Sequence, residues 1–476
     1  MRYIDCIATI KDERNVNLEY EGDGGKIREV SSQLGPDPFA RLTVERLNYW
    51  VNYALKVQEL EIKKKLYDIK DLRVIGLNLY NILFGDGTIE EGFSKARKRF
   101  DDEYRREKTQ GGEPELRMRL KLVFMKEAEK LGTLPWEFLF VPGPDNDVEK
   151  GFFFAGQKTE LILTRYVPES ELVKGLQTES GRLKVLVVIS SPQGVGTIDE
   201  RETQPLIGKI KELPNAEVKD CRNLTYDQLS AEIGGFKPHI LHFIGHGRPG
   251  ELAFVLDKEA QEYDLDKGGE QETWIPGEQF RFLFNQHKPR LVFLHACKGA
   301  VPYSLEGFNS IARELVYAEI PAVVAMQYSI SNQDAGKFAR RFYQELGDGH
   351  DIDEAVKAGR LELGGLYPPW AHPRFGTPVV YLQTDKAIVT PPKPVEARVP
   401  PAAETAAAPV GGVRISPNVI VVGTAVEREA SAQATTAPAE KPVEAQPQEL
   451  VGAAVKREAN AQATAATGEK PLETQP

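Results

Sequence analysis

From Gly181 onward, short apolar runs alternate with segments of helix length. The run RLKVLVVIS at 182–190 is continuously apolar, which is typical of a strand buried on both faces of a parallel sheet. Five further strand-like runs follow: AEVKDCRNL at 216–224, HILHFIGHG at 239–247, RLVFLHAC at 290–297, PAVVAMQYSIS at 321–331 and WAHPRFGTPVVYL at 370–382. Strands separated by helices favour a doubly wound sheet. We therefore expect an α/β fold with a mostly parallel six-stranded sheet flanked by helices.

The residues before this sheet predict a mixed α/β region. Residues 1 to about 35 alternate like the strands of a hairpin. Periodicity predicts three helices and three strand-like or buried runs: helices at about 38–67, 72–83 and 89–108, a half-buried strand at 116–124, and buried segments at 134–140 and 159–167. Trp136 lies in the apolar run LPWEFLF, where a tryptophan is most simply a core residue.

The C-terminal residues differ in composition. After about Asp385, Pro, Ala, Glu, Thr and Gln dominate, and such a segment buries too little apolar surface to offset its chain entropy. Residues 386–476 are therefore expected to be disordered. Within them, residues 423–447 recur as 452–476 at a period of 29 residues. The repeat is either a duplicated disordered segment or a tandem docking or cleavage segment.

Composition and charge exclude several classes of protein. The net charge of -10 argues against nucleic acid as the main partner. The three cysteines, Cys6, Cys221 and Cys297, are far apart and odd in number, which favours reduced thiols over a disulfide framework. Asp5 and Lys11 interrupt any signal-peptide core, and no later run is apolar enough to span a membrane. A cytoplasmic protein without membrane contact is expected.

Two of the expected strands end in reactive residues. His246 closes the run at 239–247 and Cys297 closes the run at 290–297, at the carboxyl edge where sites form in parallel sheets. A nucleophilic thiolate needs nearby positive charge, which Lys298 and an imidazole supply. The imidazole can then protonate the departing amine. Backbone N–H groups of Gly247 and Cys297 could stabilise the oxyanion. These residues predict a cysteine hydrolase.

A peptide substrate would lie beside this pair. It could add as a strand to the loop leaving the fifth strand, at Tyr328, Ser329 and Ile330. His295 shares the strand parity of Cys297, so it either lines the substrate pocket or fills it.

No metal or cofactor is expected. His239, His242, His246, His295 and Cys297 match no standard zinc spacing, and successive strand residues face opposite ways. His242 is more simply a core histidine. No G-x-x-x-x-G-K-[ST] phosphate loop occurs.

The chain resembles the CHAT domain, a caspase-like group of cysteine peptidases of clan CD. HFIGHG and LVFLHAC carry the resemblance: 51 residues separate His246 from Cys297, and Ala-Cys-Lys-Gly matches the core of the caspase cysteine motif. Further landmarks are LRVIGLNLYNILF at 72–84, LRMRL at 116–120, LPWEFLF at 134–140, LTRYVP at 163–168 and WAHPRF at 370–375. The resemblance divides the chain into an N-terminal region (1–70), an N-terminal part of the CHAT domain (70–180), a caspase-like catalytic part (181–385) and the tail.

The resemblance implies catalytic roles for His246 and Cys297. It also implies a cysteine endopeptidase that cleaves a partner protein after regulated activation, often in bacterial defence or cell death. The tetratricopeptide repeats that accompany many CHAT domains are not visible, so the activating sensor is either residues 1–70 or another protein. The alternative is a catalytically silent caspase-like scaffold, since a fold does not by itself fix a function.

Overall fold

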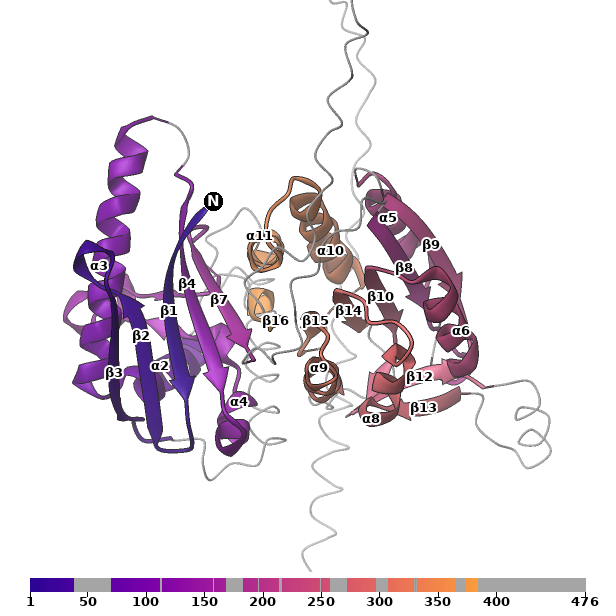
Figure 1. Ribbon diagram of the computed structural model, residues 1–476, viewed down its shortest axis with the longest axis horizontal. Helices are drawn as coiled ribbons and strands as arrows, with labels where there is room; N and C mark the ends of the chain where they lie inside the picture. The colour runs from indigo at the N-terminus through magenta and orange to yellow at the C-terminus, as the bar shows by residue number, and fades with distance from the viewer. Residues whose placement is uncertain are drawn as a thin grey trace, which may run out of the picture. The chain divides into compact units, whose positions relative to one another are not determined.

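Figure 1 shows the computed structural model of the chain. The structure describes residues 1–37, 70–111, 114–156, 158–167, 183–195, 197–213, 216–248, 250–256, 272–296, 307–328, 330, 332–364 and 373–383. These residues all belong to one unit, Met1–Arg398. The helix expected at 38–67 and the disordered tail expected at 386–476 lie outside them.

An 11-stranded sheet runs through the described residues. In spatial order its strands are β3 (Ile27–Gln33), β2 (Asn15–Glu21), β1 (Arg2–Ile10), β4 (Leu116–Phe124), β7 (Leu161–Tyr166), β16 (Pro378–Leu382), β15 (Ala322–Met326), β14 (Leu291–Ala296), β10 (Ile240–Gly245), β8 (Leu183–Ile189) and β9 (Ala216–Arg222). The last six are the predicted strands. β9, β8, β10, β14 and β15 are parallel to one another, and β16 is antiparallel to β15. The predicted α/β fold with a mostly parallel sheet is confirmed.

The region before Gly181 extends this sheet. β7 pairs in parallel with β16, β4 with β7, and β1 with β4. β1 and β2 form the predicted N-terminal hairpin, and β3 extends it by pairing antiparallel with β2. Strands from all three predicted parts of residues 1–385 therefore share one sheet. The divisions at residues 70 and 181 stay predictions.

Helices cover both faces of the strands from β8 to β16. On one face lie α5 (Glu200–Lys211), α10 (Asn332–Gly347) and α11 (Ile352–Gly364); on the other lie α6 (Tyr226–Phe236), α8 (Gly277–Phe280) and α9 (Gly307–Tyr317). Phe338, Phe342 and Leu346 of α10 are buried on one side of the helix, as their four-residue spacing predicts. Two-sided burial explains why these strands are continuously apolar. Figure 1 shows α9 and α10 on opposite sides of β14 and β15.

A second apolar cluster packs α2 (Lys70–Phe84) and α3 (Gly87–Thr109) against β1, β2 and β4. The run LPWEFLF forms a buried 3-10 turn followed by β5 (Phe140–Val141), which pairs with β6 (Phe152–Phe153). Trp136 is fully buried, as expected. The remaining short helices are α4 (Glu129–Gly132) and 3-10 turns at Asp23–Gly25, Lys126–Ala128, Trp136–Phe138, Pro144–Asn146, Val148–Lys150, Gln193–Val195, Arg281–Phe284 and Pro373–Gly376. None of the described helices is both long and apolar enough to span a membrane.

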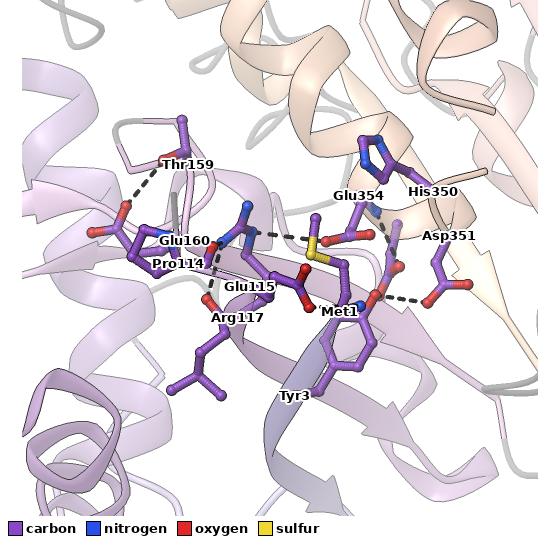
Figure 2. A network of polar contacts seen from close by, with 12 residues as sticks. Met1, Tyr3, Pro114, Glu115, Arg117, Thr159, Glu160, His350, Asp351 and Glu354 are labelled. Carbon is purple, nitrogen blue, oxygen red and sulfur yellow. Dashed lines mark hydrogen bonds and ion pairs between the residues drawn. The ribbon is translucent and has the colours of Figure 1, made fainter. Parts of the chain in front are cut away.

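The strand β4 is more deeply buried than its alternation predicts. Arg119 and Lys121, on the face expected to meet solvent, are only 5% and 3% exposed. The acidic start of α11 covers this face: Asp353 pairs with Arg119 (Oδ2 to Nε, 2.6 Å). Figure 2 shows the same junction, where Tyr3 of β1 donates to Asp351 (2.7 Å) and Arg117 of β4 faces Glu354 (3.7 Å). These pairs compensate the buried charges of β4.

A small three-stranded sheet follows β10 directly. It consists of β11 (Gly247–Arg248), β12 (Glu251–Val255) and β13 (Glu272–Pro276). The apolar run LAFVLD at 252–257 predicts a short strand, which is confirmed by β12, whereas β11 and β13 are not expected from the sequence. The segment GEQFRFLFNQ at 277–286 is also predicted to form one helix from its sequence, but it is divided into α8 and a 3-10 turn, Arg281–Phe284.

Candidate active site

His246 lies at the carboxyl end of a central strand. β10 is paired on one side with β8 and on the other with β14, and His246 follows its last residue, Gly245. The side chain is 2% exposed, and its backbone carbonyl accepts a hydrogen bond from Ala253 N (3.0 Å). A side chain on Gly245 would lie 2.5 Å from the ring of Phe243, so this position needs a glycine. The sheet therefore holds His246 at the edge where sites form in parallel α/β folds.

The neighbouring strand is in register with β10. Ile244 lies opposite His295, and Gly245 lies opposite Ala296. In the sequence the next residues are His246 and Cys297. Cys297 and Lys298 lie outside the described residues, and so does Ser329.

The other two cysteines are poor nucleophiles. Cys6 is fully buried in β1, and burial raises the pKa of its thiol. A cysteine inside the strand predicted at 216–224 is expected to be a small buried side chain. Cys221 does lie in β9, but it is only half-buried, and burial raises its pKa as well. A raised pKa leaves less thiolate at neutral pH.

Gly247 begins the hairpin that follows His246. It pairs with Leu252 of β12, and the bond from Ala253 N to His246 O makes this a non-hydrogen-bonded pair. In such a pair the N–H group of each residue points away from the partner strand. The Gly247 N–H is therefore directed away from β12.

Two buried histidines lie on the α10 face of β10 and β14. The ring centroids of His242 and His295 are 5.7 Å apart. The Tyr343 hydroxyl lies 3.0 Å from His242 Nδ1, and the His242 ring stacks on Phe293 at 4.3 Å. His242 is thus a core histidine, although its Nε2 has no hydrogen-bond partner among the described residues; neither ring nitrogen of His295 has one. Burial lowers the pKa of His295 to about 4 and that of His242 well below its ordinary value.

Acid is expected to destabilise the fold through His295. In the unfolded chain a histidine takes up its proton near pH 6.5, whereas in the fold His295 stays neutral down to about pH 4. Because the unfolded state binds more protons in this window, the free energy of unfolding should fall as the pH drops from 6.5 towards 4. The loss reaches about 3 kcal/mol for this residue.

Urea unfolding at a series of pH values measures this loss. Replacing the imidazole in His295→Phe should flatten the pH dependence between 6.5 and 4. A slope that is the same in His295→Phe and in wild type would contradict a neutral, buried His295.

The predicted substrate segment follows β15. The side chains of Tyr328 and Ile330 are 5% and 2% exposed, and the Tyr328 ring packs 6.0 Å from that of Phe138. Both side chains therefore belong to the core. Among the described residues of this segment, only backbone groups could therefore contact a ligand.

A buried ionic cluster lies beside this segment and was not expected from the sequence. Arg165 of β7 binds Glu137 with two hydrogen bonds, from Nε to Oε1 (3.0 Å) and from Nη2 to Oε2 (2.6 Å). Burial by itself would raise the pKa of Glu137, but Arg165 overrides it and the pKa lies below its ordinary value. The sequence signal was a single charge in each of the apolar runs LPWEFLF and LTRYVP.

Among the described residues, no group of three His, Cys, Asp or Glu side chains could hold a metal ion. The expectation that the protein uses no metal or cofactor stays a prediction.

The fold is a helix-covered parallel α/β sheet with a buried histidine at the carboxyl end of a central strand. A sequence profile of the CHAT domain matches residues 79–373. The match covers more than half of the 476 residues, so the chain belongs to the CHAT domain family. The predicted resemblance is confirmed.

Comparison with solved structures gives distant similarities. One is separase in the Saccharomyces cerevisiae separase–securin complex, with 13% identity and a TM-score of 0.42 over 79% of this chain and 30% of that chain. Another is the Arg-specific cysteine proteinase gingipain R, with 14% identity and a TM-score of 0.39 over 69% of this chain and 76% of that chain. The chain thus spans less than a third of the separase chain. None of the curated proteins compared with the chain matches it.

Proposed function

We propose that the chain is a cysteine endopeptidase of the CHAT type in which His246 and Cys297 form the catalytic dyad. The observation that carries the proposal is the register of β10 and β14, which pairs Gly245 with Ala296 directly before the two reactive residues. Membership of a family of caspase-like peptidases supports it. The raised pKa values of Cys6 and Cys221 also leave Cys297 as the best candidate nucleophile.

In this proposal the Cys297 thiolate attacks the carbonyl carbon of the scissile peptide bond. The oxyanion that forms is stabilised by the backbone N–H groups of Gly247 and Cys297. The direction of the Gly247 N–H, away from β12, supports its part. Collapse of the tetrahedral intermediate breaks the C–N bond, and the His246 imidazolium gives its proton to the leaving amine. A water molecule, deprotonated by His246, then hydrolyses the thioester and restores the thiol.

The substrate is a protein segment that adds as a strand beside the loop leaving β15. Tyr328, Ser329 and Ile330 would contribute backbone hydrogen bonds, and His295 would line the pocket below Cys297. The side chains of Tyr328 and Ile330 are buried, which anchors the loop to the core and supports a role in which only its backbone binds the substrate.

The proposal includes regulation of the peptidase. As in the relatives that the sequence resembles, a sensor would activate cleavage of a partner protein in the cytoplasm, in bacterial defence or regulated cell death. The sensor is either the region at 1–70 or a separate protein. The pairing of β1 with β4 supports the first option, since it joins the N-terminal strands to the main sheet.

A library of fluorogenic tetrapeptide coumarins, scanned at the residue before the scissile bond, tests the activity. The wild-type chain is expected to release coumarin from a subset of the library, and the Cys297→Ala chain from none. The same pair is then incubated with candidate partner proteins and the new termini are sequenced. Termini that persist in Cys297→Ala would refute the dyad, whereas peptide binding without any hydrolysis by wild type would favour the silent scaffold.

A further inference from the structure

Two apolar runs of the N-terminal half each carry one buried charge, and the two charges meet. Glu137 is 0% and Arg165 1% exposed, and they form the two hydrogen bonds described above. Arg165 also donates to the carbonyl oxygens of Gly132 (2.6 Å) and Leu134 (3.1 Å). The guanidinium is therefore fixed in one orientation by a carboxylate and two backbone groups.

The third member of this cluster comes from the other half of the chain. Gln327, the residue directly after β15, donates from Nε2 to Glu137 Oε2 (2.7 Å) and to the carbonyl of Gly376 (2.6 Å). Its Oε1 lies 3.3 Å from Arg165 Nη2, and its backbone N–H donates to Thr377 O (2.9 Å). Both Nε2 and Oε1 of the Gln327 side chain thus have partners within the protein, so this buried amide is satisfied without water.

Aromatic packing continues the arrangement towards the segment beyond β15. Tyr328 packs on Phe138, which follows Glu137 in sequence, and Phe138 packs edge-on against Phe375 (5.5 Å). A Cβ atom on Gly376 would lie 2.4 Å from the Phe138 ring, so the backbone at this position packs directly on the ring and leaves no room for a side chain. The polar contacts of Gln327 and the ring contacts of Tyr328 therefore fix the position of the segment that leaves β15.

We propose that Glu137 and Arg165, acting through Gln327, are positioning residues that hold the segment after β15 in register for a peptide substrate. The inference rests on the proposed function, in which this segment receives the substrate as an added strand. Strand addition requires the backbone donors and acceptors to be placed within about 0.5 Å. Gln327, fixed at the root of the segment by three contacts of its side-chain amide and one of its backbone N–H, meets this need. It also gives the landmarks LPWEFLF and LTRYVP a role in substrate binding, although both lie far from His246 in sequence.

The test compares two buried glutamines at opposite ends of the pair formed by β15 and β16. Gln327→Leu removes the amide under the substrate segment. Gln383→Leu is the matched control: Gln383 is also buried, donates to Val316 O (2.5 Å), and lies beside Pro321 at the start of β15. The substrate is the peptide coumarin that the wild-type chain cleaves fastest.

Gln327→Leu is expected to lower kcat/KM by about 10-fold to 100-fold, mainly through KM, because a small misplacement of a substrate-holding group has effects of this size. Gln383→Leu should keep kcat/KM within a factor of about two of the wild-type value. Its loss of thermal stability should be similar to that of Gln327→Leu. Alkylation of Cys297 by iodoacetamide, followed by mass spectrometry, should proceed at the wild-type rate in both variants, because this small reagent needs no substrate strand.

Equal losses of kcat/KM in the two variants would overturn the inference, as would a fall in Cys297 alkylation that matches the fall in kcat/KM. Binding of fluorescein-labelled library peptides to Cys297→Ala chains, with and without Gln327→Leu, separates this inference from the proposed function. If the wild-type chain hydrolyses no peptide and Gln327→Leu still weakens peptide binding, the peptidase is refuted and the positioning role is supported. Binding that Gln327→Leu leaves unchanged would overturn the positioning role. If neither hydrolysis nor binding is found, both proposals fall.

Discussion

A His246→Ala chain is expected to lose roughly 10²-fold to 10⁴-fold in kcat on the best peptide substrate, which is the usual contribution of a general acid and base. His246 directly follows the last residue of β10, at the carboxyl edge of the sheet. Without it the Cys297 thiol would stay mostly protonated at neutral pH, and the leaving amine would lack a proton donor. Steady-state kinetics with the peptide coumarin measure the loss.

The same strand offers a matched control in His242. It lies four residues earlier, so its side chain leaves the same face of β10, but in the core it stacks on Phe293 and packs against Tyr343. His242→Phe keeps the ring and should leave kcat within a factor of about three, with a modest loss of stability because the Tyr343 hydroxyl loses its contact. Equal losses of kcat in the two variants would contradict the assignment of His246 as the catalytic histidine.

The largest effect on stability is expected for Glu137→Gln. The Glu137 carboxylate neutralises Arg165 and also lies 3.8 Å from the Arg360 guanidinium, so one negative charge serves two buried positive charges. Burial already lowers the pKa of Arg360 to about 10, a sign that this cation is poorly compensated. Removing the carboxylate charge leaves both guanidiniums buried without a counter-charge, which should lower the free energy of unfolding by about 3–5 kcal/mol.

Urea unfolding of Glu137→Gln and of the control Glu149→Gln measures this difference. Glu149 also pairs with an arginine, Arg73 (3.0 Å), but its side chain is 79% exposed. The exposed pair should contribute less than about 1 kcal/mol. A Glu137→Gln chain as stable as Glu149→Gln would mean that the buried guanidiniums obtain their compensation elsewhere.

The strands that carry the candidate dyad could be predicted because their burial is visible in the sequence. Side chains are buried on both faces of the strands in RLKVLVVIS, HILHFIGHG and RLVFLHAC, so these runs are almost continuously apolar and are easily distinguished from loops. β13 could not be predicted in this way, because ETWIP is short and only Ile275 is buried. Its pairing with β12, across residues 257–271, is decided by the tertiary structure.

The face of β4 shows a second limit. Leu, Met, Arg and Lys alternate there as in a strand with one wet face, yet Arg119 and Lys121 are buried. Their partners are Asp353, more than 200 residues later, and Asp5, more than 100 residues earlier. A charged side chain is read as exposed unless its counter-charge is known, and the sequence does not reveal which distant carboxylate that is.

The sequence by itself determined the α/β class, the six main strands and the placement of His246 at the end of one of them, because local apolar runs and glycines specify these features. Only the tertiary structure decided that the N-terminal strands continue the same sheet and that Glu137, Arg165 and Gln327 meet. The reason is physical: strand burial follows from neighbouring side chains, whereas Gln327 lies 162 residues from Arg165 and 190 from Glu137. Such a contact exists only after the two halves of the chain have packed against each other.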